Sequence, residues 1–166
     1  CIVGFGSSGG PPMLNVLYNN NYQIVQSPGY VMIMVEMNHD ARIIRLNSEF
    51  NPDSMRRWLG DSIGFWEGNT LVVKTKNHHP QQKFRAAIRH QILISEDAEI
   101  TEKFTRVGKN EILYQFEVND DEAYKDVWKG EMPLRASQER IYEYACHEGN
   151  YAMANILAGA RAEEEQ

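Results

Sequence analysis

The chain has 166 residues, of which 42% are hydrophobic and 24% are charged, and its formal net charge is −6. This length and composition are ordinary for a soluble globular protein with one domain and a sizeable core. The negative charge argues against a general binder of nucleic acid or of anionic membranes, since neither would be attracted electrostatically. No apolar run approaches the roughly 20 residues that span a bilayer. We therefore expect no nucleic-acid partner and no transmembrane segment.

The chain contains two cysteines, Cys1 and Cys146. In an oxidising compartment a disulfide between them would close a very long loop, which is worth roughly 4 kcal/mol or more in the chain-entropy model. Two unrelated buried thiols and a lipid-modified amino-terminal cysteine are the alternatives. Because the sequence starts at Cys1 with no initiator methionine and no signal-peptide pattern, we expect a processed or trimmed product.

Most of the chain predicts short strands separated by turn residues. Residues 1–21 are the exception: they are irregular and include a flexible glycine- and proline-rich segment from Gly4 to Pro12. Elsewhere, alternating or continuous apolar runs bounded by turn residues mark the strands. We expect them at residues 22–26, 30–37, 41–46, 65–67, 70–76, 88–95, 98–107, 111–118, 124–134 and 141–148.

Two hairpins give the clearest signals. Gly68-Asn69 separates the first pair of strands, and glycine supplies the positive φ that a primed two-residue turn needs. The second hairpin turns at residues 108–110, and its strand 111–118 alternates apolar and polar residues in the manner of a half-buried strand. Pro133 marks a bulge or an edge strand, because proline cannot donate to a sheet.

A helix is expected at residues 150–163, with Asn150 as its amino-terminal cap. The strands before it come without the alternating helices of a parallel sheet. This pattern favours a single mainly β domain over residues 1–166, an antiparallel meander closed as a lipocalin-like barrel or folded as a sandwich, with the helix at its carboxy terminus.

Three polar pairs stand in apolar surroundings and are the candidate catalytic groups. An imidazole near a carboxylate can relay protons near neutral pH, and a buried carboxylate can be tuned towards that range. The structural alternatives are an internal ion pair in one case and backbone hydrogen bonding at a strand break in another. The pairs are His39 with Asp40, Glu102 with Arg106, and His147 with Glu148. In an extended strand Glu102 and Arg106 share a face with Ile100 and Phe104, so we expect both to point inward.

A metal site is an alternative for the same region. His39, His147 and Glu148 offer two imidazoles and a carboxylate, a set that suits zinc, iron or copper, although their spacing is wholly non-local. Our main expectation includes no cofactor. The candidate substrate-binding residues are Arg42, Trp66, Trp128 and Tyr144.

Four stretches of the chain resemble a bacterial family of exported proteins without an assigned activity. The motifs are specific, and the resemblance extends over nearly the whole chain. The resemblance implies a periplasmic or secreted protein, of which this chain is the carboxy-terminal portion or a short member. The stretches are residues 19–26, 36–44, 58–62 with 64–73, and 142–151, and the family motif includes His39, Asp40, Arg42, Asp61, Glu67, His147 and Glu148.

The leading functional hypothesis is an acid–base enzyme of the isomerase, lyase or cyclase type, in which an apolar pocket binds a hydrophobic or aromatic small molecule. It requires that the closing sheet bring His39 and His147 side by side. The first alternative is an exported module that binds a ligand or partner without chemistry. The second alternative is a metalloprotein with His and carboxylate ligands. Homo-oligomerisation and association with a missing amino-terminal region are left open.

Overall fold

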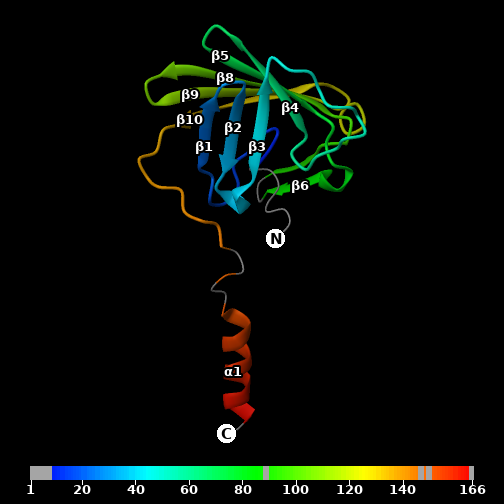
Figure 1. The fold of residues 1–166 in the computed structure, drawn as a ribbon. Helices are drawn as coiled ribbons and strands as arrows, with labels where there is room; N and C mark the ends of the chain where they lie inside the picture. The colour runs from blue at the N-terminus through cyan, green and yellow to red at the C-terminus, as the bar shows by residue number, and fades with distance from the viewer. Residues whose placement is uncertain (1–8, 88–89, 146–147, 149–150, 165–166) are drawn as a thin grey trace.

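The computed structural model describes residues 9–87, 90–145, 148 and 151–164. An eight-stranded sheet curls into a half-barrel, a two-stranded sheet accompanies it, and one helix follows at the carboxy terminus (Figure 1). The predicted fold class, mainly β with a barrel-like sheet and a terminal helix, is confirmed. The strands and the helix are β1 (Tyr22–Ser27), β2 (Tyr30–Val35), β3 (Ala41–Leu46), β4 (Asp61–Glu67), β5 (Thr70–Lys76), β6 (Phe84–Ala87), β7 (His90–Leu93), β8 (Glu99–Gly108), β9 (Glu111–Asn119), β10 (Trp128–Arg135) and α1 (Ala152–Glu164).

The large sheet has the order β1-β2-β3-β4-β5-β8-β9-β10, so β1 and β10 are its edges. All of its neighbours are antiparallel except β3 and β4, which run parallel with Ile44 opposite Ser62. A parallel pair needs a connection that carries the chain back across the sheet, and residues 47–60 provide it. Pro133 lies in β10, and its predicted place on an edge strand is confirmed.

Both predicted hairpins are present. In the first, Glu67 pairs with Thr70 across a two-residue turn in which Gly68 has φ +62°. The second joins β8 to β9, where a register shift falls between Arg106 and Gly108. These local signals therefore placed the centre of the sheet correctly.

The concave face of the half-barrel is filled by two segments from outside the large sheet. Met13 from the amino-terminal segment and Ile92 and Ile94 from the β7 region pack in one core with inward residues such as Val73 and Phe116. Residues 10–12 of the segment expected to be flexible form no helix or strand, and they are buried. Their burial is tolerated because backbone groups of the segment find hydrogen-bond partners inside.

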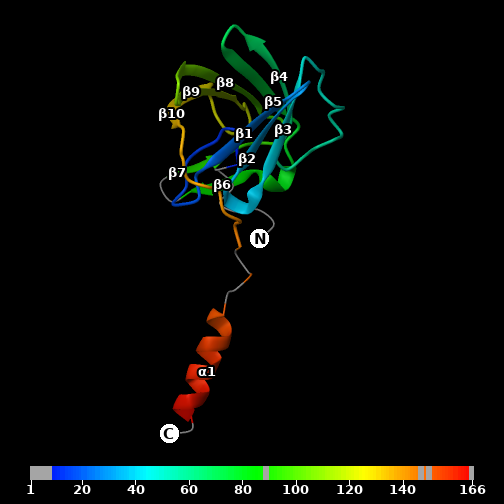
Figure 2. The ribbon, with the colours of Figure 1, turned by 60° about the vertical axis from the view of Figure 1, so that its left-hand side comes forward.

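The predicted last strand at residues 141–148 is not a strand in its described part, residues 141–145 and 148. Beyond it, α1 stands away from the half-barrel in both ribbon views (Figures 1 and 2). None of its residues is buried, although Met153, Ile156 and Leu157 form an apolar stripe at helical spacing. In the described part of the chain, α1 is too short to cross a membrane.

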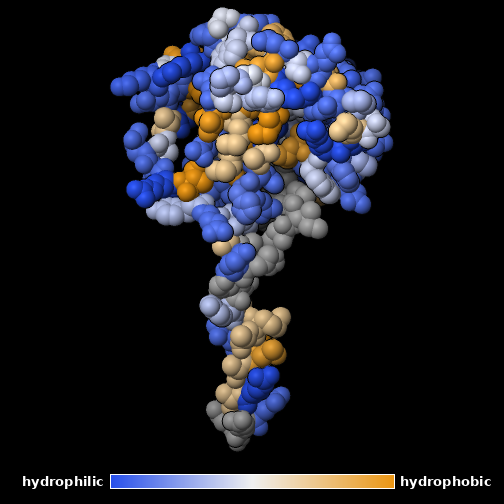
Figure 3. Space-filling view, in the orientation of Figure 1, coloured by the Kyte–Doolittle hydropathy of each residue, from blue (hydrophilic) through white to orange (hydrophobic). Residues whose placement is uncertain are grey.

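The convex face of the sheet carries an apolar row in which Val25 and Ile43 are exposed and Met32 is half-buried. Val25, Met32 and Ile43 are opposite one another on β1, β2 and β3. The space-filling view shows apolar residues gathered over these strands (Figure 3). The core is therefore on the concave side, and this row lies outside it.

Candidate functional site

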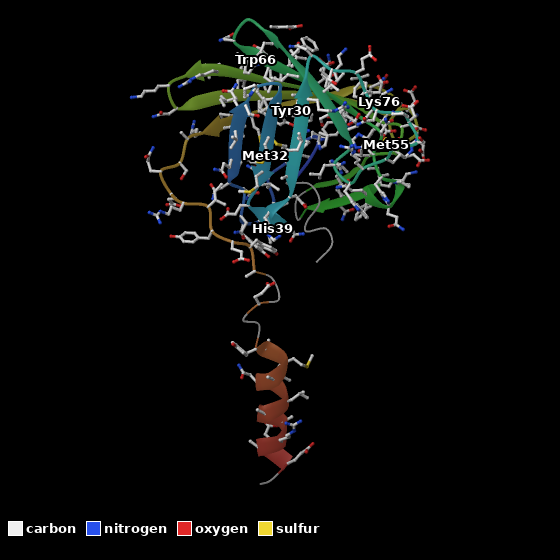
Figure 4. The ribbon with its side chains drawn as sticks, in the orientation of Figure 1. Tyr30, Met32, His39, Met55, Trp66 and Lys76 are labelled. Carbon is white, nitrogen blue, oxygen red and sulfur yellow. The ribbon has the colours of Figure 1, made fainter. Side chains whose placement is uncertain are left out.

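His39 and Asp40 lie in the short connection between β2 and β3, and they interrupt the apolar strand as predicted. His39 has φ +47° and its side chain is exposed. Figure 4 shows it at the opposite end of the sheet from Trp66. Burial raises the pKa of the half-buried Asp40, and the nearby His39 opposes this effect. The pair is together, but the imidazole is at the surface and does not line an interior cavity.

Glu102 and Arg106 do not form a pair. Glu102 points inward and is fully buried, as predicted, but it binds Arg42. Arg106 is exposed and donates to the carbonyls of Gly108 and Lys109. The prediction that Arg106 points into the core is wrong because it lies at the turn end of β8, where the register shifts and the strand extends past the core.

His147, Cys146 and Cys1 lie outside the described residues, so the predicted proximity of His147 to His39 and the predicted disulfide stay predictions. Glu148 is exposed. Within the described ranges, no three His, Cys, Asp or Glu side chains gather as a metal site. The alternative set of His39, His147 and Glu148 includes an undescribed residue and is therefore open.

The four predicted substrate-binding residues are not brought together. Arg42 is buried in an ion pair, whereas Trp66 is exposed at the tip of the β4–β5 hairpin. Trp128 is half-buried at the start of β10, where its ring meets Phe116 edge-on. Tyr144 follows β10 and is half-buried outside any strand. These side chains therefore do not form a common pocket.

A fully buried hydrogen-bonded network does connect three strands. Arg42 Nη1 and Nη2 donate to Glu102 Oε2 and Oε1 at 2.5 and 3.0 Å. The Tyr114 hydroxyl donates to Glu102 Oε1 at 2.8 Å and accepts from the Met13 backbone N–H at 2.8 Å. Burial acts to lower the pKa of Arg42, but the charge of Glu102 and its hydrogen bond outweigh burial and raise it. A pair bonded in this bidentate manner holds its geometry tightly.

A second group of buried polar side chains is much less satisfied. Arg85 is fully buried and donates from Nη1 to the Pro11 carbonyl, while its Nε and Nη2 find no partner among the described residues. His78 and Gln82 are also buried, and their side-chain nitrogens have no hydrogen bond of normal geometry to the described residues. Burial, followed by the charges of Arg85 and Arg42, lowers the pKa of His78 to about 3. The Ala98 backbone is the candidate hydrogen-bond partner of His78, and its influence raises the pKa of the imidazole slightly against these larger effects. The imidazole is therefore neutral at ordinary pH.

An open cleft of about 530 Å³ lies where the half-barrel does not close. We call it the seam cleft, because it lies between β1 and the β9–β10 edge and is bordered by the chain after β10. Its lining combines apolar side chains, amides and three cations against one carboxylate. The lining residues are Asn15, Asn20, Asn21, Tyr22, Ile24, Arg106, Lys109, Asn110, Ile112, Pro133, Leu134, Arg135, Ala136, Ser137, Glu139 and Ile141.

Tyr22 links the seam cleft to the interior network. Its side chain lines the cleft, and its phenol is close enough to Arg42 and Glu102 to feel their charges. Burial is the largest effect and raises the pKa of Tyr22 well above its usual range, so the hydroxyl keeps its proton. The cleft therefore has a solvent-exposed rim with positive charges, and the neutral Tyr22 hydroxyl lies on the side of the core.

Sequence reasoning missed the residues that matter most here. The burial of Tyr114 follows from the period-two pattern of its strand, but its bond to Glu102 does not. Arg85 gave no signal, because it lies in β6, before the strand expected at residues 88–95. The seam cleft depends on which strands become edges, and no local pattern encodes that.

Comparison of the chain with protein-family models, with curated proteins and with solved structures finds no match in any of the three.

Proposed function

We propose that the chain is a small-molecule-binding protein whose seam cleft takes a ligand with an apolar body and an anionic group. The observation that carries this proposal is the cleft itself, about 530 Å³ between two sheet edges. That volume falls in the range of roughly 300–1,000 Å³ typical of ligand pockets. Ile24, Ile112 and Leu134 supply an apolar lining for the ligand body.

The rim of the cleft favours a negative charge. Lys109 and Arg135 line the cleft and form no ion pair with the described residues, while Glu139 is the one acidic side chain of the lining. Arg106 donates hydrogen bonds to two backbone carbonyls, and its positive charge remains at the rim of the cleft. A carboxylate on the ligand would gain from these charges, and the effect would weaken with salt because the rim is open to water.

Calorimetric titration with octanoate tests the proposal, with octanol as the uncharged probe of similar shape. Wild-type protein should bind octanoate more tightly than octanol. The double variant Lys109→Met/Arg135→Met should bind octanoate about tenfold more weakly and octanol unchanged, because each exposed charge contributes up to about 1 kcal/mol.

Ala136→Trp fills the cleft and should abolish binding of both probes. Arg140→Met is the matched control, since it removes an exposed cation of the same chain segment that does not line the cleft. Equal octanoate affinity in wild type and Ala136→Trp would refute binding at the seam.

A second candidate function is acid–base catalysis at His39 and Asp40. It is favoured by one observation, the raised pKa of Asp40, which moves its carboxyl towards the range in which it can exchange protons. An NMR titration of Asp40 tests this directly, and an ordinary midpoint there would remove the support. Because neither residue lines the seam cleft, binding is the function that the geometry supports better.

A periplasmic or secreted location in the exported bacterial family is likewise a proposal, and it rests on the sequence motifs alone. Fractionation of cells that express the natural gene would test it. Recovery of the protein with the cytoplasmic fraction would count against both the location and the family assignment.

A further inference from the structure

The buried charges around Arg85 do not balance. The charged groups that act on this guanidinium are Arg42 and Glu102, and Glu102 already binds both terminal nitrogens of Arg42. Among the described residues, two guanidinium groups therefore face one carboxylate. Tyr114 does not supply the missing negative charge, because burial, followed by the charge of Glu102, raises the pKa of its phenol and keeps it neutral.

The hydrogen-bonding groups of Arg85 are also incomplete. Its Nη1 donates to the Pro11 carbonyl, which is a neutral acceptor, and its Nε and Nη2 have no acceptor in the described part of the chain. A charged donor that is buried without a hydrogen-bond acceptor generally lowers the stability of the folded state by several kilocalories per mole. Something with acceptor capacity is therefore needed beside Arg85.

His78 adds a neutral donor to the same region. After burial, the charge of Arg85 has the largest effect on the pKa of His78 and lowers it, so the two buried side chains are within electrostatic range of one another. Neither ring nitrogen of His78 has a partner of normal geometry among the residues described. A neutral imidazole can donate one N–H to a guest without adding charge.

We propose that Arg85 binds a small monovalent anion, such as chloride or a formate-sized carboxylate, inside the half-barrel with His78 as an additional donor. The site goes beyond ligand binding at the seam cleft, whose lining contains neither residue. Water could satisfy the donors of Arg85 but would leave its charge unbalanced. An anion satisfies both, and the low dielectric of the interior strengthens the attraction.

Thermal unfolding of the full chain at constant ionic strength tests the site. Sodium gluconate, an anion too large for an enclosed site of this kind, is replaced stepwise by sodium chloride, nitrate or formate. The unfolding midpoint should rise by a few degrees and level off, as expected when an anion binds only the folded state. The relative shifts with chloride and formate show whether a halide or a carboxylate fits better.

Variants separate the site from general screening. Arg85→Met should lose the saturable rise, whereas Arg140→Met, which removes an exposed guanidinium, should keep it. Equal responses of wild type and Arg85→Met, or a midpoint that is the same in every anion, would overturn the proposal.

Bromide-soaked crystals of the unmodified chain give a readout that does not depend on a variant folding. An anomalous peak within hydrogen-bond distance of Arg85 Nε or Nη2 is expected. A fully soaked crystal with ordered Arg85 and no peak there would also overturn the proposal, even if Arg85→Met could not be purified.

Discussion

The interior of the half-barrel contains two buried arginines in opposite situations. Arg42 is held by both oxygens of Glu102 and forms a network with Tyr114 and Met13. Arg85 is equally buried but meets only a backbone carbonyl in the described structure. Burial alone therefore does not reveal the role of a charged residue, and the completeness of its partners is more informative.

The difference also separates a structural role from a functional one. The ion pair of Arg42 with Glu102 joins β3 to β8, and Tyr114 of β9 donates to the same carboxylate. Both terminal nitrogens of Arg42 are paired, although its Nε has no partner among the described residues. The guanidinium of Arg85, with unpaired donors, contributes nothing comparable to stability, and its environment suits a bound anion. We expect substitutions in the Arg42–Glu102 pair to lower the free energy of unfolding strongly. Substitution of Arg85 should change it little.

Glu102→Gln should have the largest effect, because it leaves two buried guanidinium groups without a carboxylate. Breaking a buried ion pair in this way typically costs about 3–5 kcal/mol. Urea denaturation should show a loss of this size in the free energy of unfolding. Glu131→Gln, which changes an exposed carboxylate bonded to Gln115, is the control and should cost little. A loss below about 1 kcal/mol for Glu102→Gln would contradict the assigned role of the network.

His78 should make stability depend on acidity. Its folded-state pKa of about 3 lies below the ordinary value of 6.5, so the unfolded chain takes up the proton first as the pH falls. The contribution of neutral His78 to the free energy of unfolding is fully present above pH 6.5. It is lost as the pH falls towards 3, by about 1.4 kcal/mol for each pH unit.

Denaturation of wild type and His78→Leu at pH 7 and pH 5 measures this effect. The variant should lose less stability on acidification than wild type. His39→Gln replaces an exposed histidine and should behave as wild type does. The same acid sensitivity in His78→Leu and wild type would show that other groups cause it.

Tyr114→Phe should have a smaller effect, because it removes a hydroxyl but leaves the ion pair. The change deletes one bond to Glu102 and leaves the Met13 N–H without an acceptor, which together cost about 1–2 kcal/mol. Tyr142→Phe, at an exposed tyrosine, serves as the control for denaturant unfolding. No difference between the two variants would mean that the amino-terminal segment is not anchored at this bond.

Arg85→Met should have the smallest effect in gluconate buffer, within about 1 kcal/mol of wild type, since the lost bond to Pro11 is offset by removal of an unbalanced charge. Arg42→Met is the matched variant and should lose several kilocalories per mole. Similar losses for both variants in urea unfolding would remove the contrast between the two arginines.

Local patterns predicted much of this fold. The Gly68 turn and the alternation in β9 are decided by a few neighbouring residues, so both hairpins could be located. The parallel pairing of β3 with β4 depends on a return path of the chain instead. The predicted strand at 141–148 has strand-like residues, but residues 141–145 follow β10 without pairing, and strand propensity without a partner edge is not sufficient.

The candidate site was less predictable, for the same physical reason. Arg42 and Glu102 are 60 positions apart, and nothing in either segment specifies the other. Strand periodicity could indicate that Glu102 faces inward, and it did. It could not indicate that Arg106 lies past the core, because that depends on where the whole sheet ends.

The bond between the Met13 backbone and the Tyr114 hydroxyl joins positions separated by 101 residues. During synthesis the earliest part of this chain must therefore wait until β9 has emerged before it can take its place. Such distant closure is slow, since the entropy of a long loop is lost before any contact compensates for it. Until then the concave face lacks its inner packing, and chaperones would recognise the nascent sheet most readily in that interval.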